Sequence, residues 1–412
     1  MLLNTHDQWQ IKPLSEVAKI KGGKRVPKGE KLVFENTGYP YIRVADFTDD
    51  GTIDLSDIRY VTEDVFKQIK NYTINSEDLY ISIAGTIGKA GIVPKELSGA
   101  SLTENSCKLV FENIVFNRYV YYFTQTGYFI EQAGLNTRVA AMPKLALSRL
   151  GTIKLPFPPI PEQKRIVAIL DRAFADIEQA RAKTEQNLKN ARELFESYLQ
   201  QVFSHRGEGW VEYELIEIVD LKSGATAKKE FERDSGDIAY IKVSGMNLAG
   251  NEKEITTSDM YLNKVDIKNS NILPVGTTIF PKRGGAIATN KKRITSIPLC
   301  IDLNTMGIIP KTEFVLPYYI YFYFKTFDLL TISNGTTIPQ INNYSFDGLK
   351  ISVPNVECQK EEISKMREIE SQVNKLNQIY KVKLNALETL KKSILQKAFS
   401  GELSKLKEGA AA

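Results

Sequence analysis

The chain has 412 residues, more than one hydrophobic core ordinarily supports, so we expect two or three domains. Its 42% hydrophobic and 25% charged residues exclude the disordered and fibrous classes, and no apolar run is long enough to cross a bilayer. The formal net charge of +5 is too small to make the whole surface basic. The chain start lacks the basic-then-apolar order of a signal peptide, which predicts a cytoplasmic protein.

The cysteines and histidines offer little chemistry. Cys107, Cys300 and Cys358 lie far apart, without the paired spacing of a disulfide framework or a zinc site. His6 and His205 fall in expected linkers and cannot form a metal cluster. We therefore predict no metal site and little histidine chemistry.

In chain order, short apolar runs come first and a long helical pattern follows. Residues 39–47, 79–85 and 107–111 are predicted strands, and residues 120–132 are a predicted amphipathic helix. A helix then begins near Pro161, with Glu162 in its first turn, and is expected to run to about Phe203. The same order follows in the second half, with strands at 238–243 and 277–282 and a helix at 318–327.

The two halves align as a tandem repeat. At an offset of 201, Trp9 and Gly23 recur as Trp210 and Gly224, and at an offset of 196 Gln163 recurs as Gln359. We predict an α+β fold with two similar globular α/β domains, each a mixed sheet with flanking helices and each followed by a long helix. The predicted boundaries are 1–156, domain 1; 157–204, central helix; 205–353, domain 2; 354–405, C-terminal helix; and 406–412, tail.

Each long helix carries one apolar stripe with steps of three and four residues, which is the pattern of a coiled-coil seam. The stripe is broken at Arg181, Thr184 and Lys383. We predict that the helices form an antiparallel coiled coil, although each could instead lie on its own domain. The predicted seam consists of Leu170, Phe174, Ile177, Leu188, Ala191 and Tyr198 in the first helix and Met366, Ile369, Val373, Leu376, Tyr380, Leu387, Leu390 and Ile394 in the second.

Two short segments are strongly basic. Residues 19–31 hold six bases and one acid, and residues 282–293 hold five bases and no acid. A polar run rich in Asn, Thr and Gln follows at 334–343. Basic side chains suit phosphates or guanine edges, and amides suit adenine edges, so these segments fit a DNA-binding protein. Solvated, turn-rich loops would have the same composition, and that alternative stays open.

The chain contains none of the common catalytic motifs, including HExxH and GxSxG. The stretch AGTIGKAG at 84–91 is too short for a phosphate-binding GxxxxGK[ST] loop. We therefore expect a binding protein and no enzyme.

The duplicated segments PFPPIPEQKRIVAIL and VPNVECQKEEISKM, with the helix ends ESYLQQVFS and KSILQKAFSGEL, resemble a type I restriction-modification specificity subunit over nearly the whole chain. One departure is Glu357-Cys358 where the first copy has Pro161-Glu162. The resemblance implies a bipartite target in double-stranded DNA, with one domain on each half and the helices fixing the gap. It implies two methylation subunits docked on this chain, joined by restriction subunits. S-adenosylmethionine, ATP and magnesium would belong to those partners.

The predicted DNA-binding residues are the basic and amide side chains of these segments and of matched positions nearby. They are Lys21, Lys24, Arg25, Lys28, Arg43, Lys89, Arg138, Lys222, Lys228, Lys242, Lys282, Arg283, Lys291, Lys292, Arg293, Thr337, Gln340 and Asn342. Two other functions remain open: the recognition subunit of a fused restriction-methylation enzyme, and a tandem protein- or glycan-binding scaffold. Neither the target bases nor the gap can be read from this sequence.

Overall fold

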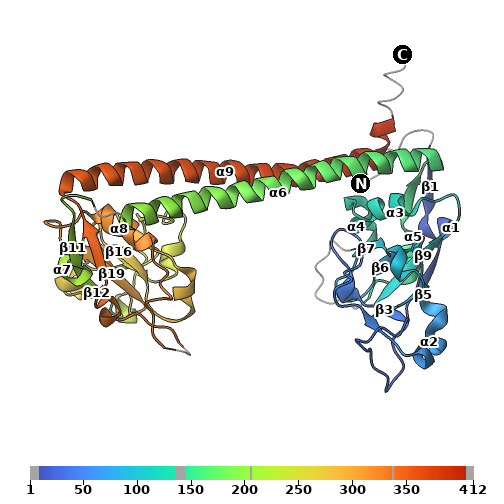
Figure 1. The fold of residues 1–412 in the computed structure, drawn as a ribbon, viewed down its shortest axis with the longest axis horizontal. Helices are drawn as coiled ribbons and strands as arrows, with labels where there is room; N and C mark the ends of the chain where they lie inside the picture. The colour runs from blue at the N-terminus through green and yellow to red at the C-terminus, as the bar shows by residue number, and fades with distance from the viewer. Residues whose placement is uncertain (1–8, 135–143, 205–206, 336–337, 405–412) are drawn as a thin grey trace, which may run out of the picture. The chain divides into compact units, whose positions relative to one another are not determined.

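The computed structural model describes residues 9–134, 144–204, 207–335 and 338–404. Two compact units divide the chain, and both long helices pass from one unit into the other. Unit 1 comprises residues 1–184 and 382–412, and unit 2 comprises residues 185–381 (Figure 1). Each unit therefore contains a globular body and one segment of each long helix.

The body of unit 1 contains three small sheets, with strand orders β2-β9-β6-β7, β4-β3-β8-β5 and β1-β10. Among the strand pairs of this body that the structure describes, β3–β8 is parallel and the others are antiparallel. The strands are β1 Gln10–Pro13, β2 Ala18–Gly22, β3 Pro40–Ile42, β4 Arg59–Tyr60, β5 Thr73–Ile74, β6 Leu79–Ser82, β7 Ala90–Ile92, β8 Ala100–Leu102, β9 Ser106–Phe111 and β10 Lys154–Phe157. The helices are α1 Leu14–Val17, α2 Glu63–Ile69, α3 Asn117–Thr124, α4 Gly127–Ala133, α5 Leu147–Thr152 and the long α6 Ile160–Ser204.

The body of unit 2 repeats this topology in the orders β12-β19-β16-β17-β14, β15-β13-β18 and β11-β20. The parallel pair recurs as β13–β18, the added strand β14 pairs parallel with β17, and an isolated bridge between Leu273 and Leu299 stands in place of β5. The strands are β11 Val211–Glu214, β12 Val219–Ser223, β13 Ile238–Ile241, β14 Glu254–Ile255, β15 Tyr261–Leu262, β16 Thr278–Pro281, β17 Arg293–Thr295, β18 Leu299–Ile301, β19 Thr305–Pro310 and β20 Lys350–Val353. The helices are α7 Leu215–Ile218, α8 Pro317–Lys325 and the long α9 Val356–Ser400. The predicted duplication and mixed sheets are confirmed.

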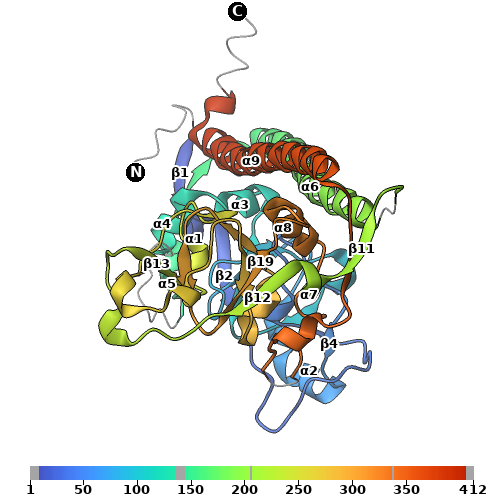
Figure 2. The ribbon, with the colours of Figure 1, turned by 90° about the vertical axis from the view of Figure 1, so that its left-hand side faces the viewer.

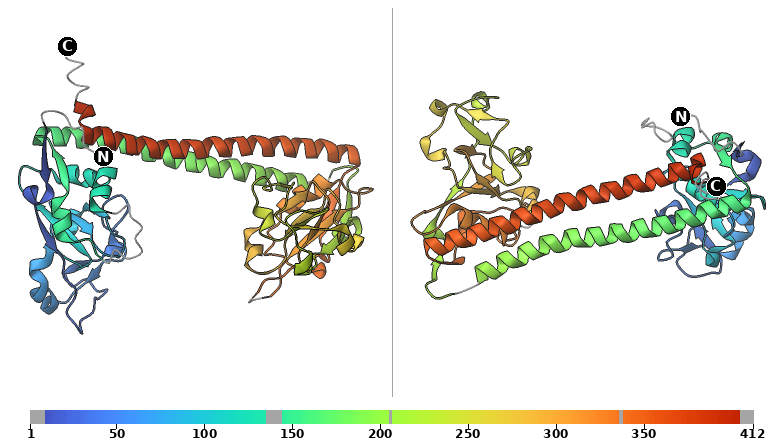
Figure 3. Two further views of the ribbon diagram at one scale, coloured as in Figure 1. Left: turned by 180° about the vertical axis from the view of Figure 1, so that it is seen from behind. Right: turned by 90° about the horizontal axis from the view of Figure 1, so that it is seen from above.

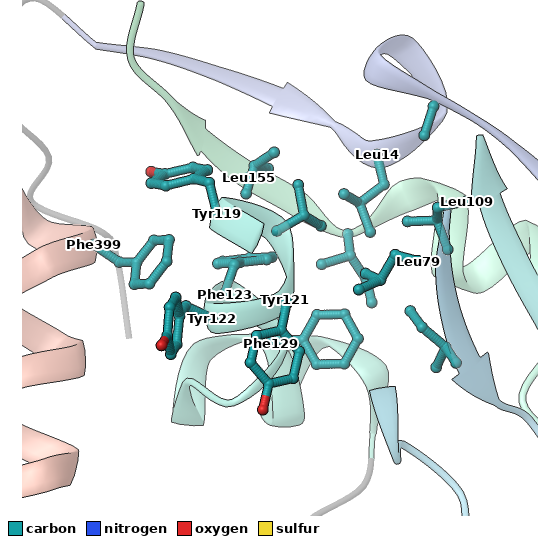
Figure 4. Packing of buried hydrophobic residues seen from close by; sticks show 14 of the residues in the cluster. Leu14, Leu79, Leu109, Tyr119, Tyr121, Tyr122, Phe123, Phe129, Leu155 and Phe399 are labelled. Carbon is teal, nitrogen blue, oxygen red and sulfur yellow. The ribbon is translucent and has the colours of Figure 1, made fainter. Parts of the chain in front are cut away.

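Each unit has its own hydrophobic core, which includes residues of both long helices. In unit 1, Phe399 of α9 packs on α3, with ring centroids 4.9 Å from Tyr119 and 5.6 Å from Phe123 (Figure 4). In unit 2, Phe195 of α6 packs edge-on against Phe322 of α8, which lies beneath the long helices (Figure 2). The aromatic helix of each body is therefore the surface on which the long helices pack.

The helices α6 and α9 pair antiparallel within each unit (Figure 3). In unit 1, Arg165 near the start of α6 donates to the carbonyl of Leu403, and Glu178 further along pairs with Lys391 at 3.1 Å. In unit 2, Tyr198 near the end of α6 donates to Glu362 near the start of α9. As the residue numbers increase along α6, those of the contacting residues decrease toward the start of α9, so the predicted antiparallel coiled coil is confirmed.

At two positions of α9, the residue that lies in the seam is the one that follows the predicted residue. Leu376 and Leu390 were expected in the seam but are 38% and 47% exposed. Glu370 is buried, and Asn377 and Lys391 are partly buried in their place. The apolar pattern missed these positions because it assumes that seam residues are apolar, whereas the structure satisfies Glu370 with two lysines.

All the other predicted seam residues are covered. Buried are Leu170, Phe174, Ile177, Ala191, Met366 and Val373, and partly buried are Leu188, Tyr198, Ile369, Tyr380, Leu387 and Ile394. Thr184, expected to interrupt the stripe, is also buried, and its hydroxyl donates to the carbonyl of Ala180 at 2.6 Å. The predicted helix at 120–132 is instead two helices, because the Thr126 side chain caps α4.

Candidate functional site

The predicted DNA-binding segments meet at one edge of the main sheet in each unit. In unit 2, the segment after β16 lies between the start of β19 and the segment before β20: Lys282 N–H donates to the carbonyl of Asn304, and Ile341 N–H donates to that of Lys282. The same two bonds recur in unit 1, from Ile83 to Asn105 and from Leu145 to Ile83, at 2.8 Å each. We call this edge the strand-end face. The repeat therefore places segments 83–89 and 282–290 at equivalent positions.

A glycine brings the first strand of each sheet close to this face. A Cβ atom on Gly23 would lie 2.0 Å from the carbonyl oxygen of Thr103, and one on Gly224 would lie 2.0 Å from that of Asp302. No side chain fits at such a distance. The matched glycines found in the sequence thus have a steric cause.

An amide cluster lies on the strand-end face of unit 2. It consists of Asn334, Gln340, Asn342 and Tyr344, in which both asparagine side chains donate to the Tyr344 hydroxyl and Gln340 donates to Asn342. An antiparallel bridge places Arg283 next to Gln340. The structure therefore brings two of the predicted segments together, with amide hydrogen-bonding groups left over for a ligand.

The five bases of 282–293 do not form a uniform patch. Arg283 is exposed, and among the described residues its guanidinium has no hydrogen bond or ion pair. The Lys282 ammonium instead donates to Ser223 at 2.9 Å, and the Lys291 ammonium donates to Asn247. Burial lowers the pKa of Lys282 below its usual value.

Lys292 is a structural residue, contrary to its prediction as a DNA contact. Only 6% of it is exposed, and its ammonium donates to Asn290 and to the carbonyl of Phe327, each at 2.6 Å. Burial lowers its pKa to about 8. Arg293 follows it into β17, where burial also lowers the pKa and Nη1 donates to the Lys292 carbonyl. These two positions are inside because the segment enters the sheet.

Several predicted contacts in unit 1 are already paired with carboxylates. Arg25 pairs with Glu104 at 2.6 Å, and the hydrogen bond from that carboxylate raises the arginine pKa. Lys89 pairs with Asp49 at 2.6 Å, and its hydrogen bond lowers the aspartate pKa. Arg43 binds Asp46 and Asp57. A phosphate must compete with these carboxylates, so each pair adds little net attraction.

The remaining predicted bases also include some that are paired within the protein and some that are not. Lys242 pairs with Glu232 at 2.8 Å, Lys228 lies 3.6 Å from Glu230, and Lys24 lies over the ring of Tyr72. Within the described ranges, the predicted bases without an ion pair, side-chain hydrogen bond or ring contact are Lys21, Lys28, Lys222 and Arg283. Arg138 and Thr337, with His6, His205 and the tail, lie outside the described residues.

Two exposed aromatic residues were missing from the predicted contacts. Phe34 is 76% exposed, and the Arg59 guanidinium stacks on its ring at 3.2 Å. Tyr344 is 61% exposed within the amide cluster. Periodicity could not single them out because neither belongs to an α-helix or a strand, and Tyr344 lies in a short 3-10 helix. What singles them out is an aromatic ring that is exposed to solvent yet fixed by a neighbouring group, and only the coordinates show this combination.

The family model described as "Type I restriction modification DNA specificity domain" matches residues 6–187 and again residues 207–397. The first match covers the first body and α6 as far as residue 187, and the second covers the second body and α9 as far as residue 397. The chain belongs to the type I restriction-modification DNA specificity family. Its strand-end faces are therefore surfaces of two specificity domains.

Relatives in this family match almost the whole chain. The "Type I restriction enzyme StySPI specificity subunit" of Salmonella potsdam is 20% identical over 424 residues, covering 96% of this chain and 89% of the relative. The EcoBI specificity subunit of Escherichia coli is 23% identical over 450 residues, covering 98% and 88%. Both halves of the chain thus take part in the likeness.

Solved structures share the fold of this specificity-family chain. A chain from "Structural basis underlying complex assembly and conformational transition of the type I R-M system" has a TM-score of 0.79 and 16% identity, covering 96% of this chain and 98% of that one. The HsdS subunit from Thermoanaerobacter tengcongensis has a TM-score of 0.62 at 16% identity, with the same coverage. No helix in the described ranges has the length and apolarity needed to cross a membrane.

Proposed function

We propose that this chain is the DNA-recognition subunit of a type I restriction-modification complex, with one half of a bipartite target bound by each body. The observation that supports this proposal is the pair of equivalent strand-end faces, which share the same backbone hydrogen bonds but carry different side chains. Equivalent scaffolds place the readers alike, and different side chains allow two different half-sites. The target in this proposal is therefore asymmetric.

The two faces differ in chemistry. Unit 2 presents the unpaired Arg283 beside the amide cluster, whereas unit 1 presents Lys28 in a cleft with the carboxylate-paired Arg25 and Arg43. Arginine and amide side chains read guanine and adenine edges in the major groove, and lysines mainly contact phosphates. Base readout by unit 2 is thus expected to depend on Arg283, Gln340 and Asn342.

The catalytic chemistry belongs to partners in this proposal. Methylation subunits dock on the paired helices and use S-adenosylmethionine, and restriction subunits use ATP and magnesium. The helices α6 and α9 also set the gap between half-sites, since a stiff tether gives its full gain in affinity at one spacing.

The test is long-read methylome sequencing of cells that express the cognate methylation subunit with or without this chain. We expect one bipartite adenine-methylation motif with a fixed gap, present only with the chain. Methylation of the same motif in its absence would refute the proposal. A fused restriction-methylation partner would co-purify with this chain from the same cells as a single polypeptide. This distinguishes a fused partner from separate methylation and restriction subunits.

A further inference from the structure

One side chain makes the same three hydrogen bonds in both units. In unit 1, Gln163 is fully buried near the start of α6, and its Oε1 accepts from Phe116 N–H at 2.9 Å. Its Nε2 donates to the carbonyls of Ile114, at 3.2 Å, and Pro158, at 2.9 Å. One amide thus joins the long helix, the turn before it and the segment before α3.

The repeat preserves this arrangement. Gln359 is fully buried near the start of α9, where Oε1 accepts from Leu316 N–H at 2.8 Å. Its Nε2 donates to the carbonyls of Phe314 and Pro354, both at 2.9 Å. The preceding residues differ between copies, Pro161-Glu162 against Glu357-Cys358, yet the amide bonds do not.

Among the described residues, the ion pairs between body and helix are not shared, although Tyr318 and Arg367, at the positions of Arg118 and Asp171, keep a hydrogen bond. Unit 1 uses Arg118 on α3 with Asp171 on α6, at 2.6 Å. Unit 2 uses Lys325 at the end of α8 with Glu370 on α9, also at 2.6 Å. Because these contacts differ in position and polarity, the glutamine bonds are the common feature of the two joints.

The joint relies on directional bonds because, apart from these ion pairs, its contacts are mainly apolar. Ring packing such as Tyr122 against Phe174 tolerates rolling and sliding, whereas three hydrogen bonds to backbone groups of separate segments fix an orientation. We propose that Gln163 and Gln359 are positioning residues that hold each body at one orientation on its long helix. One consequence, which rests on the proposed function, is that both residues narrow the range of gap lengths between half-sites at which the complex methylates DNA.

Distance measurements by electron spin resonance test the joint without DNA. Spin labels on Lys67→Cys of α2 and Lys183→Cys of α6 report unit 1, and labels on Lys268→Cys and Lys375→Cys report unit 2, all at exposed positions. Cys358→Ser removes the exposed native thiol, while Cys107 and Cys300 are buried. Gln163→Met keeps the side-chain length and removes the hydrogen bonds.

Gln163→Met is expected to broaden the distance distribution in unit 1 about twofold and to leave that of unit 2 unchanged. Gln359→Met is expected to do the reverse, so each variant is the matched control of the other. Unchanged widths in both units would overturn the proposal. Should the methionine chain not fold, Gln163→Asn serves instead, because its amide is one methylene too short to reach all three partners.

Methylome sequencing supplies the functional readout. With wild-type chain, a motif with one gap establishes the proposed function independently of the joint. With Gln163→Met, we expect the same half-sites and a preference for that gap over gaps one base pair longer or shorter that is weaker by about tenfold. A variant that methylates less but keeps the wild-type gap preference would overturn the positioning role, since lost stability alone lowers activity without changing spacing.

Discussion

Glu370 of α9 and Lys325 at the end of α8 form a buried ion pair of 2.6 Å, and Lys253 contacts the second carboxylate oxygen. Burial opposes ionisation of Glu370, but the charge of Lys325 and the hydrogen bonds from both lysines outweigh it and hold the pKa below its usual value. This cluster places a charge in the helix seam, where an apolar residue would be expected.

Removing this carboxylate should weaken unit 2. Glu370→Ala is expected to lower the free energy of unfolding of unit 2 by about 3 kcal/mol, because two partly buried lysines lose their partner. Urea unfolding followed by Trp210 fluorescence, in a Trp9→Phe background, measures this unit. The control is Glu230→Ala, whose pair with Lys228 is exposed and should contribute under about 0.5 kcal/mol. Equal losses in both variants would contradict the expectation.

The buried ammonium of Lys292 should make the stability of unit 2 depend on pH. Its folded pKa of about 8 lies below the unfolded value, so the unfolded chain binds more protons between these pH values. The free energy of unfolding should therefore rise with pH through this window, by about 2 kcal/mol between pH 7 and 9.5. Lys292→Met should lack this rise in the same Trp210 assay, and parallel pH profiles would show that the pKa is not depressed.

Arg283 should contribute to DNA affinity, and Lys292 should not. Arg283→Ala is expected to weaken binding to the target about tenfold and to weaken binding to random-sequence duplex less, because Arg283 is proposed to read a base edge. Lys292→Met is the matched control, because its ammonium is held inside. Fluorescence anisotropy with target and random-sequence duplexes provides both affinities. Equal losses on both duplexes, or an unchanged affinity for the target, would remove Arg283 from base readout.

The long helices should determine the gap. One heptad inserted into α6 after Thr184 and another into α9 after Lys381 keeps the seam in phase and lengthens each helix by about 10 Å. Methylome sequencing is expected to show the same half-sites with a gap longer by about three base pairs. The original gap in the lengthened variant would show that other contacts set the spacing.

Sequence patterns predicted the fold because they are local or repeated. The offset from Trp9 to Trp210 revealed the duplication, and the long stripe around Leu170 and Phe174 predicted the helix and its seam. These signals depend only on which residues recur at which spacing. The phase of the seam in α9 escaped because the buried Glu370 is stabilised by lysines 45 and more residues away in sequence.

The candidate site, too, was predictable from the sequence in its local features but not in its contacts between distant residues. Sequence alone determined that a basic segment occurs in each half, with an amide-rich run in the second, and that the halves share one scaffold. Only the tertiary structure decided that Arg25 is tied to Glu104, that Lys292 is inside and that Arg283 lies beside Gln340. Spacing along a chain specifies the period of an element, but whether a charge is free depends on which distant groups the fold brings within a few ångströms.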